Sequence, residues 1–491
     1  MMKRIILMMC CITIGFTSCN DFIDIDPISE ETTANAYNSA SQIEAALVGA
    51  YESFHSSEYY VWDFVVFQDI RSDNCYAGGD NPEIFQVDFL EIEPTHSRIF
   101  THWSNIFNAI SKTNLVLSRV ELIDDFALTE ERREQIMGEA YFLRAYHYFT
   151  LVKLFGGVPL LTEPVTSAEA ANVNIPRASV QEVYNQILLD LEIASTLLPD
   201  TYGSDASINK GRATSGAVNA LAAKVHAQKP SPDYNAVLDH IEALEGSAAS
   251  YQLIDYARLF DGNSYNNAES ILEVQYLGGD LGNYGPQLLL PPSITQDAWR
   301  KFATPSVNIV NAFDAENDEI RKNASIIFEP VQWVDEYWGN SPGSTIPFSY
   351  KWKNASGFAS SDNTYLLRYG DIVLLKAEAL NELGQLSQAV NEVNRIRNRV
   401  LLPDLTPEQS SSQEVMRNTI LKERRLELFL EGHRWDDLVR YNKVIETMNT
   451  IEDIDLRTGN PVNYNMTPEK ILLPIPQQEL DRNPTLTQNP L

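Results

Sequence analysis

Paired amphipathic helices are the feature of this sequence that most constrains its fold. Apolar residues recur at helical spacing in several segments, small residues are frequent among them, and short breaks separate them. Gly156 and Gly384 follow two of these segments, where glycine is well suited to end a helix. The segments predicted to be helical are 41–54, 103–117, 138–155, 180–198, 214–228, 234–244, 369–383 and 385–400. Paired helices stack into a continuous core, so we predict a mostly α fold with minor β structure.

Long insertions interrupt the helical pairs, whose spacing resembles that of tetratricopeptide repeats. Four of the seven tryptophans lie between positions 299 and 352, outside the predicted helices. The insertions are 68–82, 278–305, 331–353 and 456–464. Because loops on a rigid scaffold commonly carry binding residues, we expect function to reside there.

The residues in these insertions suit a carbohydrate ligand. Flat aromatic rings stack on the apolar faces of sugars, while Asn and Asp side chains bond hydroxyl groups. The candidate ligand-binding residues are Asp73, Asn74, Tyr76, Trp299, Trp333, Tyr337 and Trp338. The alternative is that these aromatic side chains cover the scaffold as a second small core.

Composition argues against several classes of function. The 491 residues include 67 acidic and 37 basic side chains, giving a net charge of -30. Nucleic acids and anionic lipid surfaces attract basic proteins, so we expect neither as a partner. The chain has no P-loop, no Gly-X-Ser-X-Gly elbow and no His-Glu-X-X-His motif, and we predict no enzymatic activity and no cofactor. A glycosidase-type carboxylate pair is the alternative, but spacing cannot single out one pair among so many acids.

No metal site is predicted either. The histidines and cysteines lack the spacing of a zinc site. The acidic run 314–319 lacks the glycine of an EF-hand calcium loop, and we interpret it as a solvated turn.

The N-terminus is typical of a secreted lipoprotein. Lys3 and Arg4 precede a mostly apolar run over 5–16, which is too short to span a membrane. The run ends in Phe-Thr-Ser-Cys at Cys19, which looks like a bacterial lipobox. We therefore predict a signal peptide over 1–18 and lipid attachment at Cys19, the alternative being an ordinary signal peptide with an incidental cysteine.

Cysteine content then predicts a fold without disulfides. Cys10 and Cys11 would leave with the signal peptide, and Cys19 would carry lipid. Cys75 alone would remain, so the core must hold the fold together.

The densest run of charge and apolar residues in the chain is 423–440. Leu421, Leu428, Trp435 and Val439 fall on one face of a predicted helix that runs through Gly432, and the glycine is expected to leave room for a second backbone to come close. The opposite face carries Glu423, Glu427 and Glu431, a row of like charges that needs arginine partners. Either Glu427, Glu431 and His433 form an active site, or ion pairs lock a structural helix. We favour the structural interpretation, because charged helix faces are more often paired than catalytic.

The stretch 423–440 closely resembles the signature helix of the SusD/RagB family of outer-membrane nutrient-binding lipoproteins. Further resemblance lies in 142–159, 211–224, 367–378 and 473–484. The resemblance covers nearly all of a single mature domain, 19–491, with an N-terminal part of about 19–230 and a C-terminal part of about 231–491.

The resemblance implies a lipid-anchored protein of the outer membrane, exposed on the cell surface. It implies capture of an oligosaccharide or glycan and delivery to a SusC-like TonB-dependent transporter. Capture of peptides or another nutrient is the alternative within the family. A helical-repeat protein-interaction module is a further alternative, although it leaves the aromatic insertions unexplained.

Overall fold

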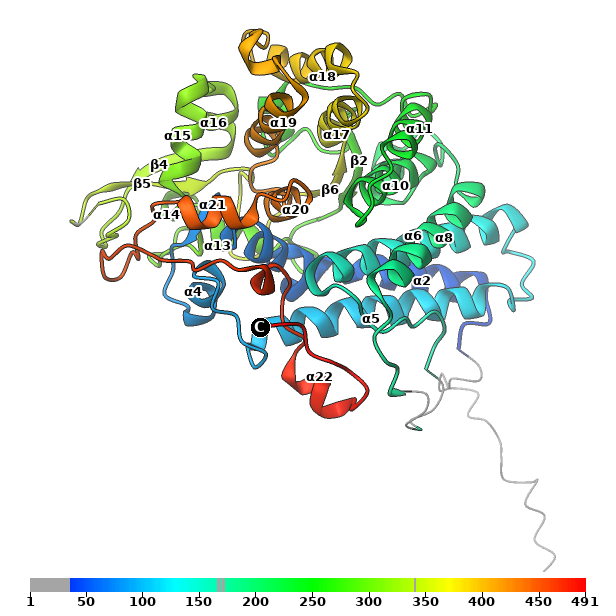
Figure 1. The fold of residues 1–491 in the computed structure, drawn as a ribbon. Coiled ribbons are helices and arrows are strands. Elements are labelled where there is room, and N and C mark those ends of the chain that lie inside the picture. Colours follow the sequence, from blue (N-terminus) through cyan, green and yellow to red (C-terminus); the bar gives the residue numbers. More distant parts are fainter. Residues whose placement is uncertain (1–35, 166–168, 170–172, 340) are drawn as a thin grey trace, which may run out of the picture.

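The structure is a computed structural model that describes residues 36–165, 169, 173–339 and 341–491. The predicted signal peptide and Cys19 lie outside these residues. Within them the chain is mostly helical, as predicted, with a few short strands (Figure 1).

All eight predicted helices are present. Most of the predicted ends agree with the observed ones to within three residues, although the second and third helices begin further toward the N-terminus than predicted. The bounds are α2 Ala40–Tyr51, α5 Ser97–Val120, α6 Glu130–Phe155, α8 Val180–Leu197, α10 Ser215–Gln228, α11 Tyr234–Glu245, α17 Tyr369–Glu382 and α18 Leu386–Arg399.

Local sequence explains where these helices begin and end. Ser179 and Glu182 form a capping box at the start of α8, in which each side chain binds the other residue's backbone N–H. Gly156 ends α6 with φ of 73°, and Gly384 separates α17 from α18 with φ of 75°. Both glycines therefore have the positive φ that glycine tolerates at a helix end.

The helices pack as neighbouring pairs. Helices α5, α6 and α8 lie side by side, α10 packs on α11, and α17 packs on α18 and α11 (Figure 1). Alanines make the α10 crossing close, since Ala217, Ala220 and Ala223 are buried. The result is the predicted scaffold of helical pairs.

Short elements fill the insertions. In the part of the chain that the structure describes, three two-stranded antiparallel sheets pair β1 with β3, β2 with β6, and β4 with β5. The strands are β1 Cys75–Ala77, β2 Ser270–Val274, β3 Ala303–Pro305, β4 Ile326–Pro330, β5 Thr345–Ser349 and β6 Thr364–Arg368. The remaining α-helices are α3 Asp63–Val65, α4 Pro82–Asp88, α9 Ala206–Gly211, α12 Tyr256–Leu259, α13 Gly285–Leu289, α14 Pro292–Thr295, α15 Val307–Glu316, α16 Glu319–Ser325, α19 Gln413–Glu427, α20 Arg434–Arg440, α21 Val444–Thr450 and α22 Gln477–Arg482. Insertion 331–353 is therefore less irregular than predicted, because it includes β5.

The prediction of one continuous helix over 423–440 is wrong. Helix α19 ends at Glu427, and α20 begins only at Arg434. The intervening turn has positive φ at Leu430 and Gly432. The buried carboxylate of Asp69 accepts hydrogen bonds from the backbone N–H groups of both residues, at 3.1 Å each. A distant side chain thus satisfies the turn, which helical periodicity cannot reveal.

Gly432 does allow a close approach, but a different one from that predicted. A Cβ atom at this position would lie 2.7 Å from the ring of Phe64. The neighbour is therefore a side chain rather than a second backbone.

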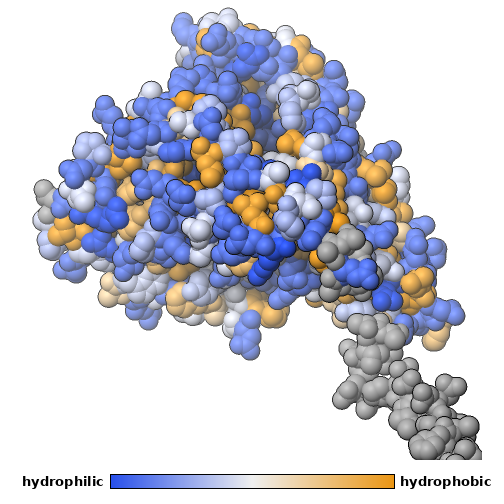
Figure 2. Space-filling model, turned by 60° about the horizontal axis from the view of Figure 1, so that its bottom comes forward, coloured by the Kyte–Doolittle hydropathy of each residue, from blue (hydrophilic) through white to orange (hydrophobic). Residues whose placement is uncertain are grey.

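The surface is predominantly polar. On the face turned forward in Figure 2, apolar side chains form small patches among hydrophilic ones. Among the described residues, none of the helices has the length and apolar content needed to cross a membrane. Cys75 is a free, buried thiol.

Candidate functional site

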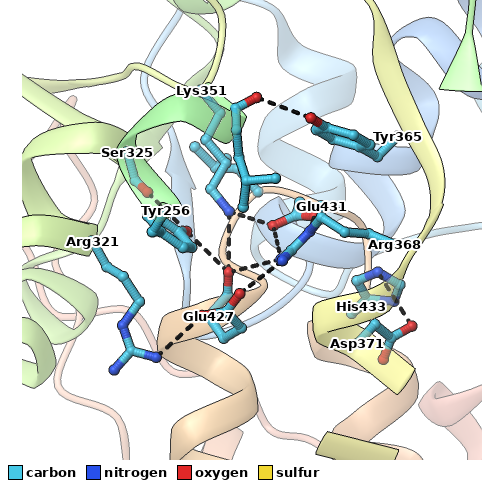
Figure 3. A network of polar contacts seen from close by, with 12 residues as sticks. Tyr256, Arg321, Ser325, Lys351, Tyr365, Arg368, Asp371, Glu427, Glu431 and His433 are labelled. Carbon is cyan, nitrogen blue, oxygen red and sulfur yellow. Dashed lines mark hydrogen bonds and ion pairs between the residues drawn. The ribbon is translucent and has the colours of Figure 1, made fainter. Parts of the chain in front are cut away.

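The glutamate row of 423–431 lies in a buried network of ion pairs, which we call the ion-pair seam. Glu423 lies 2.7 Å from Arg321 and 3.0 Å from Arg397. Glu427 pairs with Arg321, Arg368 and Arg399, and Figure 3 shows the first two of these contacts. Each of these glutamates therefore meets at least two guanidinium groups.

Glu431 completes the seam. Its carboxylate lies 2.5 Å from Lys351 and 2.8 Å from Arg368 (Figure 3). The side chains of Glu423, Glu427 and Arg321 have no solvent exposure at all. Charged side chains buried in this way are tolerated when charged partners and hydrogen bonds surround them. The ion pairs of the seam join α19 to α16, α18 and β6.

The electrostatics of the seam do not suit proton transfer near neutral pH. Burial alone would raise the pKa of Glu427, but Arg399 and Arg368 outweigh it and hold the pKa at about 2. Burial lowers the pKa of His433 to about 3, and neighbouring Lys224 adds to the effect. Glu427 stays ionised and His433 stays neutral, and this supports the structural interpretation.

Asp73 and Asn74 lie inside the protein rather than on a surface loop. Asp73 accepts two hydrogen bonds from Arg434, at 2.7 and 2.8 Å. Asn74 donates to Asp69 at 2.9 Å and accepts from Arg425 at 2.9 Å. Insertion 68–82 thus packs against the 425–434 segment, and its polar side chains are already bonded to residues of that segment.

The structure brings Tyr76 and Tyr337 together. Their rings stack with centroids 4.0 Å apart and an angle of 11° between their planes. Tyr76 donates to Asp335 at 2.8 Å, and Tyr337 donates to Asp453. Both tyrosines are buried, so this pair is part of the core in this structure.

Trp333 and Trp338 are half-buried beside β4 and β5. Trp333 meets the ring of Phe348 edge-on, at 6.4 Å between centroids. Trp338 donates from its indole nitrogen to the carbonyl of Pro305 at 3.2 Å. They cover this small sheet, as the core interpretation of the aromatic residues describes.

Trp299, in contrast, belongs to a group of near-parallel aromatic rings at the surface. Phe358 stacks on Tyr284 with centroids 4.5 Å apart and an angle of 24° between their planes. Trp299 lies 6.5 Å from Phe358, with an angle of only 9°. Tyr284 is 41% exposed and Phe358 is 38% exposed. We call the rings of Tyr284, Trp299 and Phe358 the aromatic platform.

Two bridged loops hold the Tyr284 and Phe358 rings of the platform in place. Tyr284 directly precedes α13, and Phe358 lies between β5 and β6. The backbones of Asn283 and Ser360 exchange hydrogen bonds of 2.7 and 3.2 Å, which joins the loops. A Cβ atom at Gly282 would lie 2.4 Å from the backbone of Ala359, so this approach requires glycine.

The Phe358 loop has an unusual backbone conformation. Ser356, Gly357 and Phe358 all have positive φ, of 48°, 63° and 73°. A bulky residue such as phenylalanine rarely adopts positive φ, and local strain of this kind clusters at binding sites. This conformation leaves the Phe358 side chain exposed beside the exposed ring of Tyr284, and neighbouring exposed apolar side chains of this kind can mark a binding surface.

Sequence reasoning placed Tyr284 in a candidate insertion but missed Phe358. The only available signal was a single aromatic residue in a loop rich in Ser, Asn and Gly. Phe358 pairs with Tyr284 because backbone hydrogen bonds between Asn283 and Ser360 join the two loops, and the sequence does not reveal this contact.

The acidic run 314–319 is solvated only in part. Asp314, Asn317 and Glu319 are exposed, as expected for a solvated turn. Asp318, in contrast, is buried and pairs with Arg321. Glu316 lies 2.9 Å from Arg397 and also pairs with Lys422, so these two carboxylates depart from the expectation.

Together, a scaffold of helical pairs and a group of aromatic rings at the surface are typical of a ligand-binding class of protein. The chain belongs to the SusD/RagB family. The SusD family model matches residues 343–491, and a second model, described as "Starch-binding associating with outer membrane", matches residues 21–226. This family is a starch- and glycan-binding one.

Similar proteins span almost the full chain. A SusD-like protein of Formosa agariphila is 27% identical over 519 residues, covering 96% of this chain and 95% of the relative. The starch-binding protein SusD of Bacteroides thetaiotaomicron is 23% identical, covering 97% and 96%. A solved structure described as a laminarin-binding SusD-like protein is 28% identical with a TM-score of 0.76, covering 92% of this chain and 100% of that one.

Proposed function

We propose that this protein captures a neutral glycan on the aromatic platform, as an outer-membrane lipoprotein that delivers it to a SusC-like TonB-dependent transporter. The observation that carries the proposal is the near-parallel arrangement of Tyr284, Trp299 and Phe358 at the surface, where Tyr284 and Phe358 are exposed and Trp299 is half-buried. Tyr284 and Phe358 cover one face of each other, and the ring surface that stays open offers apolar contact to the C–H faces of sugar units. The laminarin-binding relative and the starch-binding family support a glycan as ligand.

The segments that carry the rings also contain exposed side chains that could bond sugar hydroxyl groups. Asp280, Gln296, Ser356 and Ser361 are exposed in the same loops. Carboxylate, amide and hydroxyl groups placed around apolar rings provide the orientation that stacking alone lacks.

The charges around the platform favour a neutral glycan over one that carries carboxylates or sulfates. Arg300 donates to the carbonyl of Val334 at 2.5 Å, and Lys353 donates to the carbonyls of Ala324 and Tyr350. Lys301 is buried beneath Trp299. The basic side chains of the two loops are thus bonded to protein groups, whereas Asp280 is exposed.

The anchor and the transporter partner rest on the sequence. Cys19 in its lipobox-like context would receive the lipid, and two acyl chains hold a protein stably at a membrane. The family model associated with the outer membrane supports the same location.

The proposal is tested by calorimetry on the soluble chain that begins after Cys19. The ligands are laminarin, starch, a uronic-acid polymer and a set of oligopeptides. We expect saturable binding to a neutral glycan, weakened on the order of tenfold or more by Tyr284→Ala or Phe358→Ala, because each loses a stacking surface. Trp352→Phe, a buried aromatic change, serves as the control.

Other outcomes would revise the proposal. Binding to peptides alone would move the function to peptide uptake. Tight binding to the uronic-acid polymer would overturn the preference for a neutral ligand. Glycan binding that survives both alanine variants would place the site elsewhere.

A further inference from the structure

We infer that Lys301 is a positioning residue of the proposed glycan site, which sets the Trp299 ring without touching the ligand. This inference rests on the proposed function of the platform. Lys301 is 1% exposed, and its ammonium nitrogen lies 3.6 Å from the centroid of the Trp299 ring. A cation centred over one ring face at this distance occupies that face. A sugar can therefore stack only on the opposite face.

A cage of oxygen atoms fixes the ammonium group. The Asp297 carboxylate accepts two hydrogen bonds from it, at 2.8 and 2.7 Å. The carbonyl of Gln287 and the hydroxyl of Thr295 accept two more, at 3.0 Å each. Lys301 thus connects α13, α14 and the Asp297–Trp299 segment to a single point beneath the indole ring.

The cage determines how firmly the ring is held. Trp299 is half-buried and lies in the loop between α14 and β3 rather than in a helix or strand. Without a cation beneath it, the ring would lose its support and the Asp297 carboxylate its main partner. A ring that must be ordered on binding binds more weakly than one already ordered.

The ammonium charge gives the cage a distinctive pH dependence. Burial lowers the pKa of Lys301 to about 8, and Asp297 partly offsets this effect. Asp297 is the charged group that faces the ammonium; the other contacts, Gln287, Thr295 and Trp299, are uncharged. Above about pH 8 the lysine becomes neutral, which removes both the ion pair and the attraction to the ring.

The test compares glycan affinity at about pH 6.5 and about pH 9 for three proteins, using the neutral glycan that the wild-type chain binds. The variants are Lys301→Met, which keeps the length of the side chain but no charge, and Lys210→Met as a matched control. Lys210 also lies over a ring, 4.4 Å from the Tyr251 centroid, and burial lowers its pKa to about 8. It belongs to α9, which packs on β2.

We expect the wild-type protein and Lys210→Met to lose affinity at the higher pH. Lys301→Met should bind weakly at both, on the order of tenfold below wild-type at the lower pH, since the ring is no longer pre-ordered. Thermal melting checks that the variants are folded. If Lys301→Met does not fold, Asp297→Asn, which removes the counter-charge, should lower the pH at which wild-type-like affinity is lost.

The failure of this inference differs from failure of the proposed function. Wild-type affinity that is equal at the two pH values, or a Lys301→Met variant that titrates like the wild type, would overturn the role of Lys301 while leaving glycan binding intact. Binding that is indifferent to Tyr284→Ala and Phe358→Ala would instead overturn the platform itself.

Discussion

The ion-pair seam and the aromatic platform use opposite means to hold their residues. The seam concentrates charge where solvent is excluded, and every charged side chain of its glutamate row meets partners from other elements. The platform places apolar rings at the surface, on loops of which those of Tyr284 and Phe358 are joined by a backbone bridge. In the seam, charged side chains stabilise the fold, whereas in the platform the aromatic rings form the candidate binding site.

The seam's arginines should therefore matter to stability and not to ligand capture. We expect Arg368→Met to lower the free energy of unfolding by about 3–5 kcal/mol, because Glu269, Glu427 and Glu431 would stay buried without their shared partner. Urea unfolding measures the change. Lys112→Met is the control: its pair with Glu52 is largely exposed, and its loss should cost less than about 1 kcal/mol.

Equal costs for the two variants would contradict the contrast between buried and exposed charge. A loss of glycan affinity in a folded Arg368→Met protein would contradict the separation between seam and platform.

The turn at Gly432 allows a second comparison within the seam region. Gly432 and Gly384 have nearly the same φ, 73° and 75°. A Cβ at Gly432 would meet Phe64, whereas the space around Gly384 is open. Gly432→Ala should thus cost about 2–4 kcal/mol from strain and overpacking together, and Gly384→Ala about 1–2 kcal/mol from strain alone.

Thermal or urea unfolding of the two glycine variants checks this difference. Matching losses of stability would show that Phe64 can move aside at no cost.

Burial of His433 also makes the stability of the fold sensitive to acid. His433 has a folded pKa of about 3, depressed by burial, against an ordinary value of 6.5. As pH falls below about 6.5, the unfolded chain takes up a proton that the folded chain does not, so stability falls. His433→Gln should reduce this loss between pH 7 and pH 5, measured by urea unfolding at each pH.

His147 and His226, with folded pKa values of about 3 and 4, should preserve part of the slope. An unchanged slope in His433→Gln would show that His433 does not contribute to the acid sensitivity of the fold.

Helical periodicity predicted the scaffold well because each pair of helices buries a face that its own sequence displays. The end of α6 at Gly156 and the turn at Gly384 are local in the same sense. The break between α19 and α20 was missed because Asp69, some 360 positions earlier in the chain, caps it.

The candidate site was less predictable than the scaffold. Insertion 68–82 contains polar residues typical of a surface loop, but Arg425 and Arg434 draw Asp73 inward. Phe358 becomes part of the candidate site only because its loop is bridged to the loop of Tyr284 and because its backbone has positive φ. The burial of Asp73 and the placement of Phe358 both depend on contacts between segments that are far apart in the sequence, which a local sequence pattern cannot predict.

The smallest expected effect on glycan affinity is that of changing Trp338, an aromatic residue outside the platform. Trp338 is as prominent in the sequence as Trp299, yet its indole is bonded to Pro305 and meets Phe328 edge-on. We expect Trp338→Ala to change glycan affinity by less than about threefold, since interface residues beside the main anchors contribute little. Calorimetry against the same glycan, with Phe358→Ala alongside, measures the difference. A loss for Trp338→Ala as large as that for Phe358→Ala would extend the binding surface to β4 and β5, and the platform would then be one part of a longer site.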